Sequence, residues 1–411
     1  MYYNKTSIEK HGFFEVNNLD SLKPFIEYYK SPFYLYSKEV IARQYELFTK
    51  NIPAKFKVFY AQKSNPNKEI LKFIHKLGAG CDTASFMEMK NGLEAGFDNE
   101  HLMLTGPGKT EEEIKFAVSE NILSINVESF QELELVNRIA EQLNIKKDIL
   151  VRINPPFDSS ETNRIIGGSG VSKFGIDLEQ IPEFIKLANT LDNVNLNGIH
   201  IFNSSQILDH GKILQNTKDV INTAIHFSEN FDLEVKRIDL GGGFGIPYSA
   251  DESELDIVSL GKGLEEFFND EKIKTFTENV DMYFELGRYL SGLCGIYLTK
   301  VLYTKTSQGK NIAITDGGVH HLIRPVLIGQ NHPMVNLTAL LEERTEKKNY
   351  LIAGPLCTSL DEFDDNAELL ITKPGDILAV LNAGAFSGFS PFHFSATDGF
   401  EGYFPFLLFI S

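Results

Sequence analysis

The sequence predicts an α/β protein: a (β/α)8 barrel of the TIM type over residues 36–285, and a mostly antiparallel β domain formed by both chain ends, residues 1–35 and 286–411. Two observations predict this division. In the first part, eight short apolar runs are separated by amphipathic helical stretches, a pattern typical of parallel βα units. After about residue 286, short β-rich segments separated by Gly, Pro, Asp or Asn replace it, as in antiparallel sheets.

The individual elements follow from this pattern, because eight βα units in roughly 250 residues are the size of a barrel. The predicted barrel strands are Lys57–Lys63, Ala79–Ala84, Leu102–Thr105, Ser124–Glu128, Ile149–Ile153, Leu196–Phe202, Arg237–Leu240 and Met282–Glu285. Helices are expected between them, including Lys68–Leu77, Thr110–Glu120, Glu128–Leu143, Leu178–Thr190 and Lys212–Asn230. The predicted strands of the β domain are Pro32–Tyr36, Tyr297–Tyr303, Asn311–Thr315, Asn349–Ile352 and Ile377–Leu381, and Tyr403–Ile410 is expected to be a buried strand or an interface segment.

Composition restricts the possible functions. The 411 residues carry a net charge of −17, which argues against nucleic acid or an anionic membrane as a main partner. Three widely spaced cysteines, Cys81, Cys294 and Cys357, favour a reducing compartment over a disulfide framework, and none has the spacing of a zinc ligand. Neither a signal peptide nor an apolar run long enough to span a membrane is visible. We therefore expect a cytoplasmic protein without a metal.

Lys63 ends the first predicted barrel strand, in Tyr60–Pro66, directly before a helix. The carboxyl ends of barrel strands carry the active sites of such folds. A lysine that is desolvated there has a lowered pKa and can form a Schiff base with a carbonyl. The alternative is a solvated lysine at the end of a strand.

Three consecutive glycines, Gly241, Gly242 and Gly243, follow the seventh predicted strand. Their backbone N–H groups can bind phosphate, and the loops after the seventh and eighth strands often do so in barrels. A tight strand–helix turn is the alternative, because a glycine run alone is a weak signal and this one has neither Rossmann nor Walker spacing.

Glu285 and Arg288 end the eighth predicted strand, in Phe284–Tyr289. Arginine suits phosphate and a carboxylate can pair with a protonated ring nitrogen, so the two could bind opposite ends of one cofactor. A surface ion pair is the alternative. In the β domain, Ala353–Cys357 places a cysteine in a turn, where a buried and inert thiol is the default expectation.

Together these motifs resemble the fold-type III pyridoxal-phosphate decarboxylases, the alanine-racemase-like group of diaminopimelate, ornithine and arginine decarboxylases. The resemblance runs from Ser31–Tyr34 to about Phe394 and includes Gly80–Ser85, Ser172–Ile176 and Asp316–Gly318. It implies pyridoxal 5'-phosphate as the cofactor. It also implies a homodimer whose active sites lie between subunits and are completed by the β domain.

The resemblance implies a role for each motif residue. Lys63 would hold the cofactor as a Schiff base, supported by Asp82 and Glu88. Glu285 would keep the pyridine nitrogen protonated, which strengthens the ring as an electron sink. Cys357 would reach into the partner subunit's site and return a proton after CO2 leaves, which requires a thiol. The phosphate would be held by Gly241, Gly242, Gly243, Ser205 and Arg288.

Two aromatic residues depart from the family pattern. Phe202 stands where members usually place a histidine that stacks on the cofactor, and a phenyl ring can stack but cannot donate a hydrogen bond. Phe386 replaces a usual tyrosine, so a hydrogen bond to the phosphate is lost there. His200 is expected to be a packed barrel histidine.

The residue after the cysteine bears on the substrate. Family members commonly have an acid there that binds a distal ammonium, whereas Cys357 is followed by Thr358, which cannot form an ion pair. This feature resembles a subgroup that decarboxylates amino acids held on acyl carrier proteins, as in butirosin biosynthesis, and some siderophore-pathway enzymes. Arg324 instead matches the carboxylate-binding arginine of diaminopimelate decarboxylases. The stretches similar to the carrier-protein subgroup are Leu104–Lys109, Leu298–Tyr303, Asp316–His321, Ile352–Thr358 and Ser390–Phe394.

The sequence therefore predicts decarboxylation of an amino acid that is tethered to an acyl carrier protein or otherwise conjugated, in natural-product or siderophore biosynthesis. A decarboxylase of a free amino acid such as meso-diaminopimelate is the alternative that Arg324 favours. Phe202 and Phe386 leave open a catalytically inactive, pyridoxal-phosphate-binding regulator. A racemase would need a second base in place of the Cys357 loop.

Overall fold

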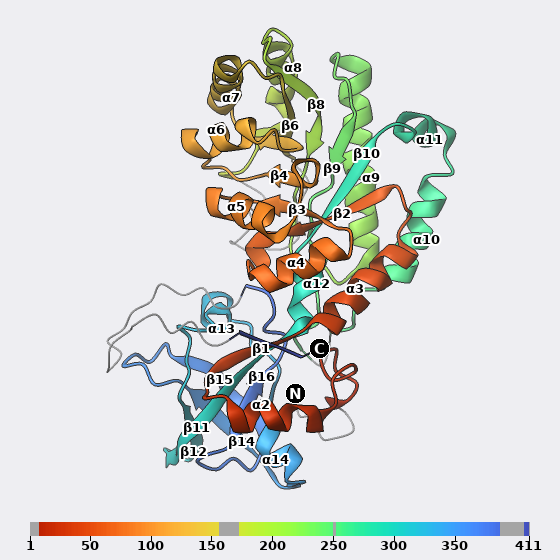
Figure 1. Cartoon of the computed structure of the whole chain (residues 1–411). Coiled ribbons are helices and arrows are strands. Elements are labelled where there is room, and N and C mark those ends of the chain that lie inside the picture. The colour runs from red at the N-terminus through yellow and green to blue at the C-terminus, as the bar shows by residue number, and fades with distance from the viewer. Residues whose placement is uncertain (1–7, 156–171, 250–251, 387–406, 411) are drawn as a thin grey trace. The chain divides into compact units, whose positions relative to one another are not determined.

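The structure is a computed structural model that describes residues 8–155, 172–249, 252–386 and 407–410 (Figure 1). The chain divides into two compact units. The barrel unit comprises Tyr45–Gly245 and Glu254–Gly287. The β unit comprises Met1–Gln44, Ile246–Ser253 and Arg288–Ser411, so it contains both chain ends.

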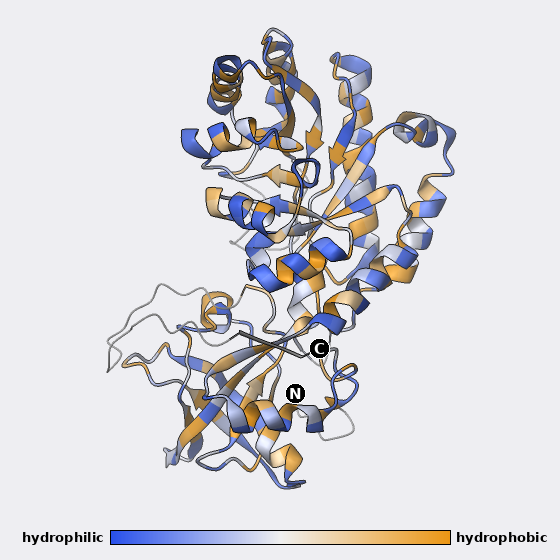
Figure 2. Ribbon diagram, viewed as in Figure 1, coloured by the Kyte–Doolittle hydropathy of each residue, from blue (hydrophilic) through white to orange (hydrophobic). Residues whose placement is uncertain are grey.

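Eight parallel strands form a closed barrel in the barrel unit, as predicted. Each pairs with its neighbour in chain order, and β10 pairs with β2 to close the ring. A further short strand, β7 (Ile176–Asp177), pairs only with β6. The strands are apolar and buried while the surrounding helices are amphipathic (Figure 2). The barrel strands are β2 (Phe56–Ala61), β3 (Gly80–Thr83), β4 (Leu102–Leu104), β5 (Ser124–Val127), β6 (Lys147–Asn154), β8 (Val194–His200), β9 (Arg237–Asp239) and β10 (Asp281–Leu286).

Helices follow the barrel strands and begin at residues suited to capping. In α4 the side chain of Asn67 accepts hydrogen bonds from the first turn, and Ile70, Leu71 and Ile74 form its buried face. The expected helices are confirmed within a few residues. The helices are α3 (Lys38–Asn51), α4 (Lys68–Lys76), α5 (Phe86–Ala95), α6 (Glu111–Ser119), α7 (Phe130–Leu143), α8 (Ile181–Ala188), α9 (His210–Asn230), α10 (Ile257–Phe267) and α11 (Glu271–Thr277), with 3-10 turns η2 (Gln62–Ser64), η3 (Asn99–His101) and η4 (Leu178–Gln180).

The β unit contains a mostly antiparallel sheet in the order β13-β16-β11-β12-β14-β15, with β1 joining β11 to β17. The β12–β14 and β1–β17 pairs are parallel. The last strand falls within the segment predicted as a strand, of which residues 403–406 lie outside the described residues. The elements are η1 (Leu19–Leu22), α2 (Lys23–Tyr28), β1 (Phe33–Ser37), α12 (Arg288–Ser291), η5 (Gly292–Cys294), β11 (Gly295–Ser307), β12 (Lys310–Thr315), α13 (Arg324–Ile328), β13 (Met334–Asn336), α14 (Leu337–Leu341), β14 (Lys347–Ala353), β15 (Glu362–Leu370), β16 (Ile377–Val380) and β17 (Leu407–Ile410).

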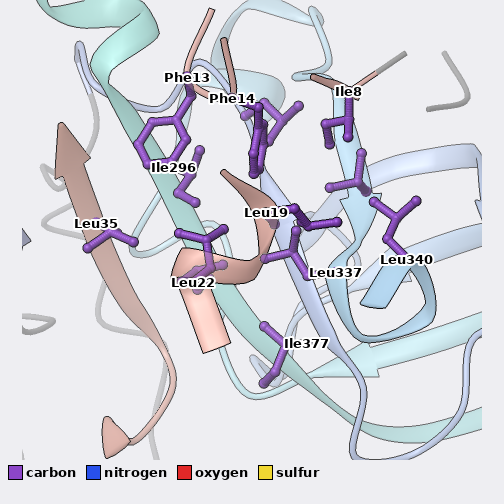
Figure 3. Packing of buried hydrophobic residues seen from close by; sticks show 14 of the residues in the cluster. Ile8, Phe13, Phe14, Leu19, Leu22, Leu35, Ile296, Leu337, Leu340 and Ile377 are labelled. Carbon is purple, nitrogen blue, oxygen red and sulfur yellow. The ribbon is translucent and has the colours of Figure 1, made fainter. Parts of the chain in front are cut away.

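The core of the β unit joins the N-terminal segment to the sheet (Figure 3). Phe13 and Leu22 from that segment pack with Leu35 of β1, Ile296 of β11 and Ile377 of β16. Burial of such side chains stabilises the unit by about 1.5–3 kcal/mol for each large apolar residue. Sequence-distant parts of the chain therefore share one core.

None of the helices in the described residues is long and apolar enough to cross a membrane.

Candidate active site

Lys63 lies just past the carboxyl end of β2, in η2, as the barrel pattern predicts. Its Nζ atom is 3.5 Å from Oδ2 of Asp82 in β3 and 4.0 Å from Oε2 of Glu285 in β10. Both carboxyl groups are buried. The fold therefore brings together three residues that come from three separate sequence motifs.

The pKa of Lys63 corrects one expectation. Burial lowers it, but the acidic surroundings, with the Asp82 carboxylate foremost, raise it more, so the pKa lies above that of a free lysine. The prediction of a lowered pKa is wrong because it considered desolvation without the neighbouring carboxylates. Lys63 is an ammonium ion in this arrangement, and it must lose a proton before its amine can bond to a carbonyl carbon.

Phe202 lies beside Lys63, and the glycine run packs against Phe202. The Phe202 ring centroid is 5.6 Å from Lys63 Nζ. Gly241 and Gly243 have φ angles of 62° and 104°, a region that side-chain-bearing residues rarely adopt. A Cβ on Gly242 would lie 2.3 Å from a backbone oxygen of β10. The loop thus requires glycine to pass so close to the strand, and it presents bare backbone of the kind that binds phosphate.

Ser205 lies half-buried in the loop after β8. This loop packs against the glycine run, since the N–H of Ile207 donates to the carbonyl of Gly243 at 2.8 Å. The N–H of Gly241 donates to Asp239 at 3.0 Å. Because the N–H of Gly241 is already bonded to Asp239, the predicted phosphate site in the barrel unit depends on Ser205, Gly242 and Gly243.

A buried polar network beneath these loops was not found from the sequence. His200 is fully buried, with Nε2 3.6 Å from Oε1 of Glu285. The amide nitrogen of Asn126 is 3.1 Å from Oδ2 of Asp239 and 3.3 Å from Nδ1 of His200. Burial, reinforced by nearby cations, lowers the pKa of His200 well below its usual range, so the ring is neutral. The expectation of a packed barrel histidine is confirmed, but His200 packs against Glu285.

A sequence signal for this network existed. Asn126 and Asp239 interrupt strands whose other buried positions are mostly apolar, and a buried polar group needs a partner. The apolar runs were read for their periodicity alone, so the polar exceptions within them were passed over.

Several buried polar atoms of the barrel unit lack a hydrogen-bond partner in the parts of the chain that the structure describes, and pyridoxal phosphate could supply one. Oδ1 of Asp82, Oε1 of Glu285 and Oδ1 of Asn203 are buried and have no hydrogen-bond partner among the described residues. Buried polar atoms are costly unless something satisfies them. A polar ligand with a cationic ring nitrogen would do so.

Two further charged residues surround this site. Glu88, at the start of α5, accepts a hydrogen bond from the N–H of Ala84 at 2.7 Å, and burial raises its pKa. Arg152 of β6 forms a buried ion pair with Glu128 at 2.8 Å. Glu88 was predicted as a supporting residue, whereas the Arg152 pair was not.

In the β unit, two arginines surround one tyrosine. Arg288 donates to the hydroxyl of Tyr248 at 2.8 Å, and its Cζ is 4.7 Å from the ring centroid of Phe386. Arg324 lies 3.6 Å from the centroid of Tyr248 and donates to Oε1 of Gln330 at 2.6 Å. Phe386 is 39% exposed. Arg288 contacts Phe386, and Arg288 and Arg324 both contact Tyr248. The sequence reasoning did not single out Tyr248.

Both guanidinium groups keep free donors. Within the described ranges, Nε of Arg288 and both Nε and Nη1 of Arg324 are buried without an acceptor. Burial lowers the pKa of Arg324 to about 10, at which it remains charged near neutral pH. Such an arginine suits a ligand carboxylate or phosphate.

Cys357 and Thr358 lie in the loop between β14 and β15. Cys357 is exposed, unlike Cys81 and Cys294, which are buried and whose pKa values burial raises. The default expectation of a buried thiol is therefore wrong for Cys357. The hydroxyl of Thr358 accepts a hydrogen bond from the N–H of Leu360 at 3.2 Å.

Asp361 holds this loop, and sequence reasoning missed it. Its carboxylate accepts hydrogen bonds from the N–H groups of Val319 and Leu356, both at 2.7 Å, and the side chain is buried. A Cβ on Gly318 or Gly354 would lie 2.3 Å or 2.4 Å from this carboxylate. One carboxylate thus ties the cysteine loop to the glycine pair after β12.

Comparisons with known proteins agree with this arrangement. The family model for the pyridoxal-dependent decarboxylase pyridoxal binding domain matches residues 38–292. An L-glutamyl-[BtrI acyl-carrier protein] decarboxylase of Niallia circulans is 31% identical over 373 residues, covering 89% of this chain and 86% of its own. A diaminopimelate decarboxylase of Aquifex aeolicus is 33% identical over 368 residues, covering 89% and 84%. The crystal structure of diaminopimelate decarboxylase from Helicobacter pylori complexed with L-lysine superposes with a TM-score of 0.81 at 29% identity, covering 89% of each chain.

Proposed function

We propose that this protein decarboxylates a tethered or conjugated amino acid. The chain belongs to the pyridoxal-dependent decarboxylase family, whose members are carboxy-lyases that use pyridoxal phosphate to decarboxylate amino acids. The resemblance inferred from the motifs and the predicted cofactor are confirmed. The identity of the substrate and the roles of individual residues are the proposal. One observation carries the choice of substrate, namely the polar groups beside Cys357.

The Cys357 loop has no carboxylate free to bind a distal ammonium. Between Gly354 and Asp361 the only acid is Asp361 itself. Its oxygens accept two backbone N–H groups, and it is buried under the loop. Thr358, at the position next to the thiol, offers a hydroxyl and no charge. A substrate with a distal amide, thioester or ester linkage suits these groups better than a free diamine does.

The barrel residues would carry the shared chemistry. Bound pyridoxal phosphate supplies an electron sink for the bond that breaks. Lys63 would hold it covalently, Asp82 and Glu88 would support Lys63, and the Glu285 carboxylate would face the ring nitrogen. Phe202 would stack on the ring face.

The remaining contacts would complete the site. Gly242, Gly243 and Ser205 in the barrel unit, with Arg288 and its neighbour Phe386 in the β unit, would bind the phosphate. Cys357, exposed on its loop, would donate a proton to the carbon that loses CO2. We assign that loop to the partner subunit's active site, so the working form is a homodimer.

A free amino acid remains a second candidate, and Arg324 favours it. The two buried N–H donors of Arg324 described above would bind a substrate carboxylate. Diaminopimelate carries a second carboxylate of this kind, whereas a glutamyl group joined through one carboxyl keeps only the carboxylate that is lost as CO2. Arg324 therefore supports the free amino acid, and the preference for a tethered substrate rests on Thr358.

The test is CO2 release by the protein loaded with pyridoxal phosphate. Free glutamate, diaminopimelate and ornithine are compared with glutamyl and related aminoacyl thioesters of a carrier protein or of pantetheine. The proposal expects turnover of thioesters at least tenfold faster than of any free amino acid. Faster turnover of a free amino acid overturns the substrate assignment, and K63A supplies the blank for non-enzymatic release.

A further inference from the structure

The carboxyl groups of Asp239 and Glu285 lie side by side inside the barrel unit, with carboxyl oxygens within 4.8 Å of one another. Asp239 ends β9 and Glu285 lies in the adjacent strand β10, and they are 0% and 3% exposed. Two ionised carboxylates this close in a buried site repel one another, so one of the two takes up a proton. The pair therefore holds one proton.

The hydrogen-bond donors around the pair show which member is ionised. Oδ1 of Asp239 accepts from the N–H of Gly241 at 3.0 Å, and Oδ2 accepts from the amide nitrogen of Asn126 at 3.1 Å. Donors of this kind favour the charged form. Oε1 of Glu285 has no hydrogen-bond partner in the described part of the chain. Asp239 is thus the ionised member and Glu285 the protonated one.

The neighbouring histidine, His200, lies beside this pair as a neutral ring. A ring nitrogen of His200 and carboxyl oxygens of Asp239 and Glu285 lie within 4.8 Å of one another. These atoms could also bind a metal ion. However, Nδ1 of His200 accepts from the amide of Asn126, so the neutral ring carries its proton on Nε2, the atom nearest Glu285. A nitrogen that carries a proton is no metal ligand, and the geometry favours a shared proton over a cation.

The other charges around Glu285 act in both directions. Burial, followed by the negative charges of Asp239 and Asp82, raises the pKa of Glu285 well above its usual range. Lys63 and Arg152 lower it by smaller amounts. The pKa of Asp239 is itself raised to about 6, by burial and then by Asp82. The charged or titratable groups that face Glu285 are Lys63 after β2, Asp82 in β3, Arg152 in β6, His200 in β8 and Asp239 in β9.

We propose that Asp239 is a positioning residue that keeps Glu285 protonated before the cofactor binds, so that Glu285 delivers the proton which the pyridine nitrogen then holds. For a ring that enters with a neutral nitrogen, the proton moves from a Glu285 oxygen to that nitrogen. The transfer leaves a carboxylate beside a ring cation and needs no proton from solvent. This inference rests on the proposed contact between Glu285 and the ring, and it adds Asp239 as the residue that sets the charge of Glu285.

The first test is made on the cofactor-free protein, so it does not depend on turnover. Carbon-13 NMR of protein labelled at glutamate carboxyls, with the Glu285 signal assigned by its loss in E285Q, follows the protonation of Glu285 against pH. The expected result is a protonated Glu285 at pH 7 whose titration midpoint falls in D239N, because a neighbouring negative charge is removed. An ionised Glu285 at pH 7, or an unchanged midpoint in D239N, overturns the proposal.

A matched control and a second variant keep the test decisive. D281N removes a carboxylate from the opposite end of β10 and should leave the Glu285 midpoint unchanged. If D239N does not fold, N126S removes one of the two donors that hold Asp239 ionised, and the proton should shift from Glu285 toward Asp239. A Glu285 signal that is unaltered in N126S contradicts the proposal.

The second readout concerns the bound cofactor. Pyridoxal phosphate labelled with nitrogen-15 in the ring reports whether that nitrogen carries a proton. In D239N the ring nitrogen should lose its proton at lower pH than in the wild type, because the charge of Asp239 no longer stabilises the ring cation. The same titration in both proteins would show that Asp239 has no influence on the ring. Decarboxylase activity could still be present in that case, so the two proposals fail separately.

Discussion

The two units of the chain support the proposed chemistry in different ways. In the barrel unit, Lys63, Asp82 and Glu285 come from three strand ends, and the two acids are buried. In the β unit, Cys357 lies exposed on a loop that a single carboxylate, Asp361, attaches to the rest of the sheet. Asp82 and Glu285 of the barrel unit lie on strands, whereas Cys357 and Thr358 of the β unit lie on a loop, and loops vary more readily than strands. Changes in the barrel unit should abolish chemistry, whereas changes in the β unit should tune it.

The largest effect is expected for K63A. Loss of the amine that we propose binds the cofactor covalently should reduce CO2 release by more than about a thousandfold, as loss of a nucleophile does in other enzymes. K68A is the matched control, since Lys68 begins α4 and forms an exposed ion pair with Glu94. Substantial turnover by K63A would show that the barrel half does not work as described.

C357A should be the most severe change in the β unit. Removal of the proposed proton donor should slow turnover by about a hundredfold or more, or divert it to a ketone by-product, while the cofactor stays bound. The measurements are CO2 release and product analysis, with cofactor content from absorbance. Unchanged kinetics would mean that the thiol is not the proton donor.

D361N should weaken turnover without changing cofactor content. Hydrogen bonds to a charged group contribute about 1.5–3 kcal/mol each, and the neutral amide offers one acceptor oxygen in place of two. We expect kcat to fall about tenfold because the Cys357 loop is less well fixed. D365N changes an exposed acid in β15 and should have no effect. Equal kinetics for the two variants would show that Asp361 does not position the loop.

T358E should shift specificity by a smaller factor. A carboxylate beside the thiol supplies a counter-charge for a distal ammonium, so diamine-type substrates should improve about three- to tenfold relative to thioesters, the range of an exposed ion pair up to one assisted by hydrogen bonds. Competition assays with ornithine and an aminoacyl thioester measure the ratio. An unchanged ratio would mean that the shape of the loop, and not its charge, determines the substrate.

The smallest expected effect is on the stability of the folded protein, and it concerns Asp239 in the barrel unit. The pKa of Asp239 is about 6 in the folded protein, above the value of about 3.9 for an unfolded aspartate. The folded state therefore binds more protons between these values, and its stability falls as pH rises through this window. D239N should raise the melting temperature of the cofactor-free protein by a few degrees at pH 7.5 and have little effect near pH 3.5. A lower melting temperature at pH 7.5 would show that ionised Asp239 is stabilising.

Periodicity predicted most of the fold because buried strands and amphipathic helices leave strong signals. The eight barrel strands confirm this, while β15 (Glu362–Leu370) was missed. Its first half contains three acids, Glu362, Asp364 and Asp365, and then Asn366, and these hide an alternation that becomes regular only near its end. Lys63, the glycine run and Glu285 were found because each lies at or just past the carboxyl end of a strand, and Asp82 was found through the resemblance to the family. Asp361 and the raised pKa of Lys63 depend on which groups the fold brings together, which spacing along the chain does not reveal.

The measurement that tests the central claim most directly is the location of the cofactor. The loaded protein is reduced with borohydride, digested, and searched by mass spectrometry for the peptide that carries the reduced pyridoxyl group. The account predicts that this group is attached to Lys63 and that the modified peptide is absent from K63A. Attachment to any other lysine would contradict the account.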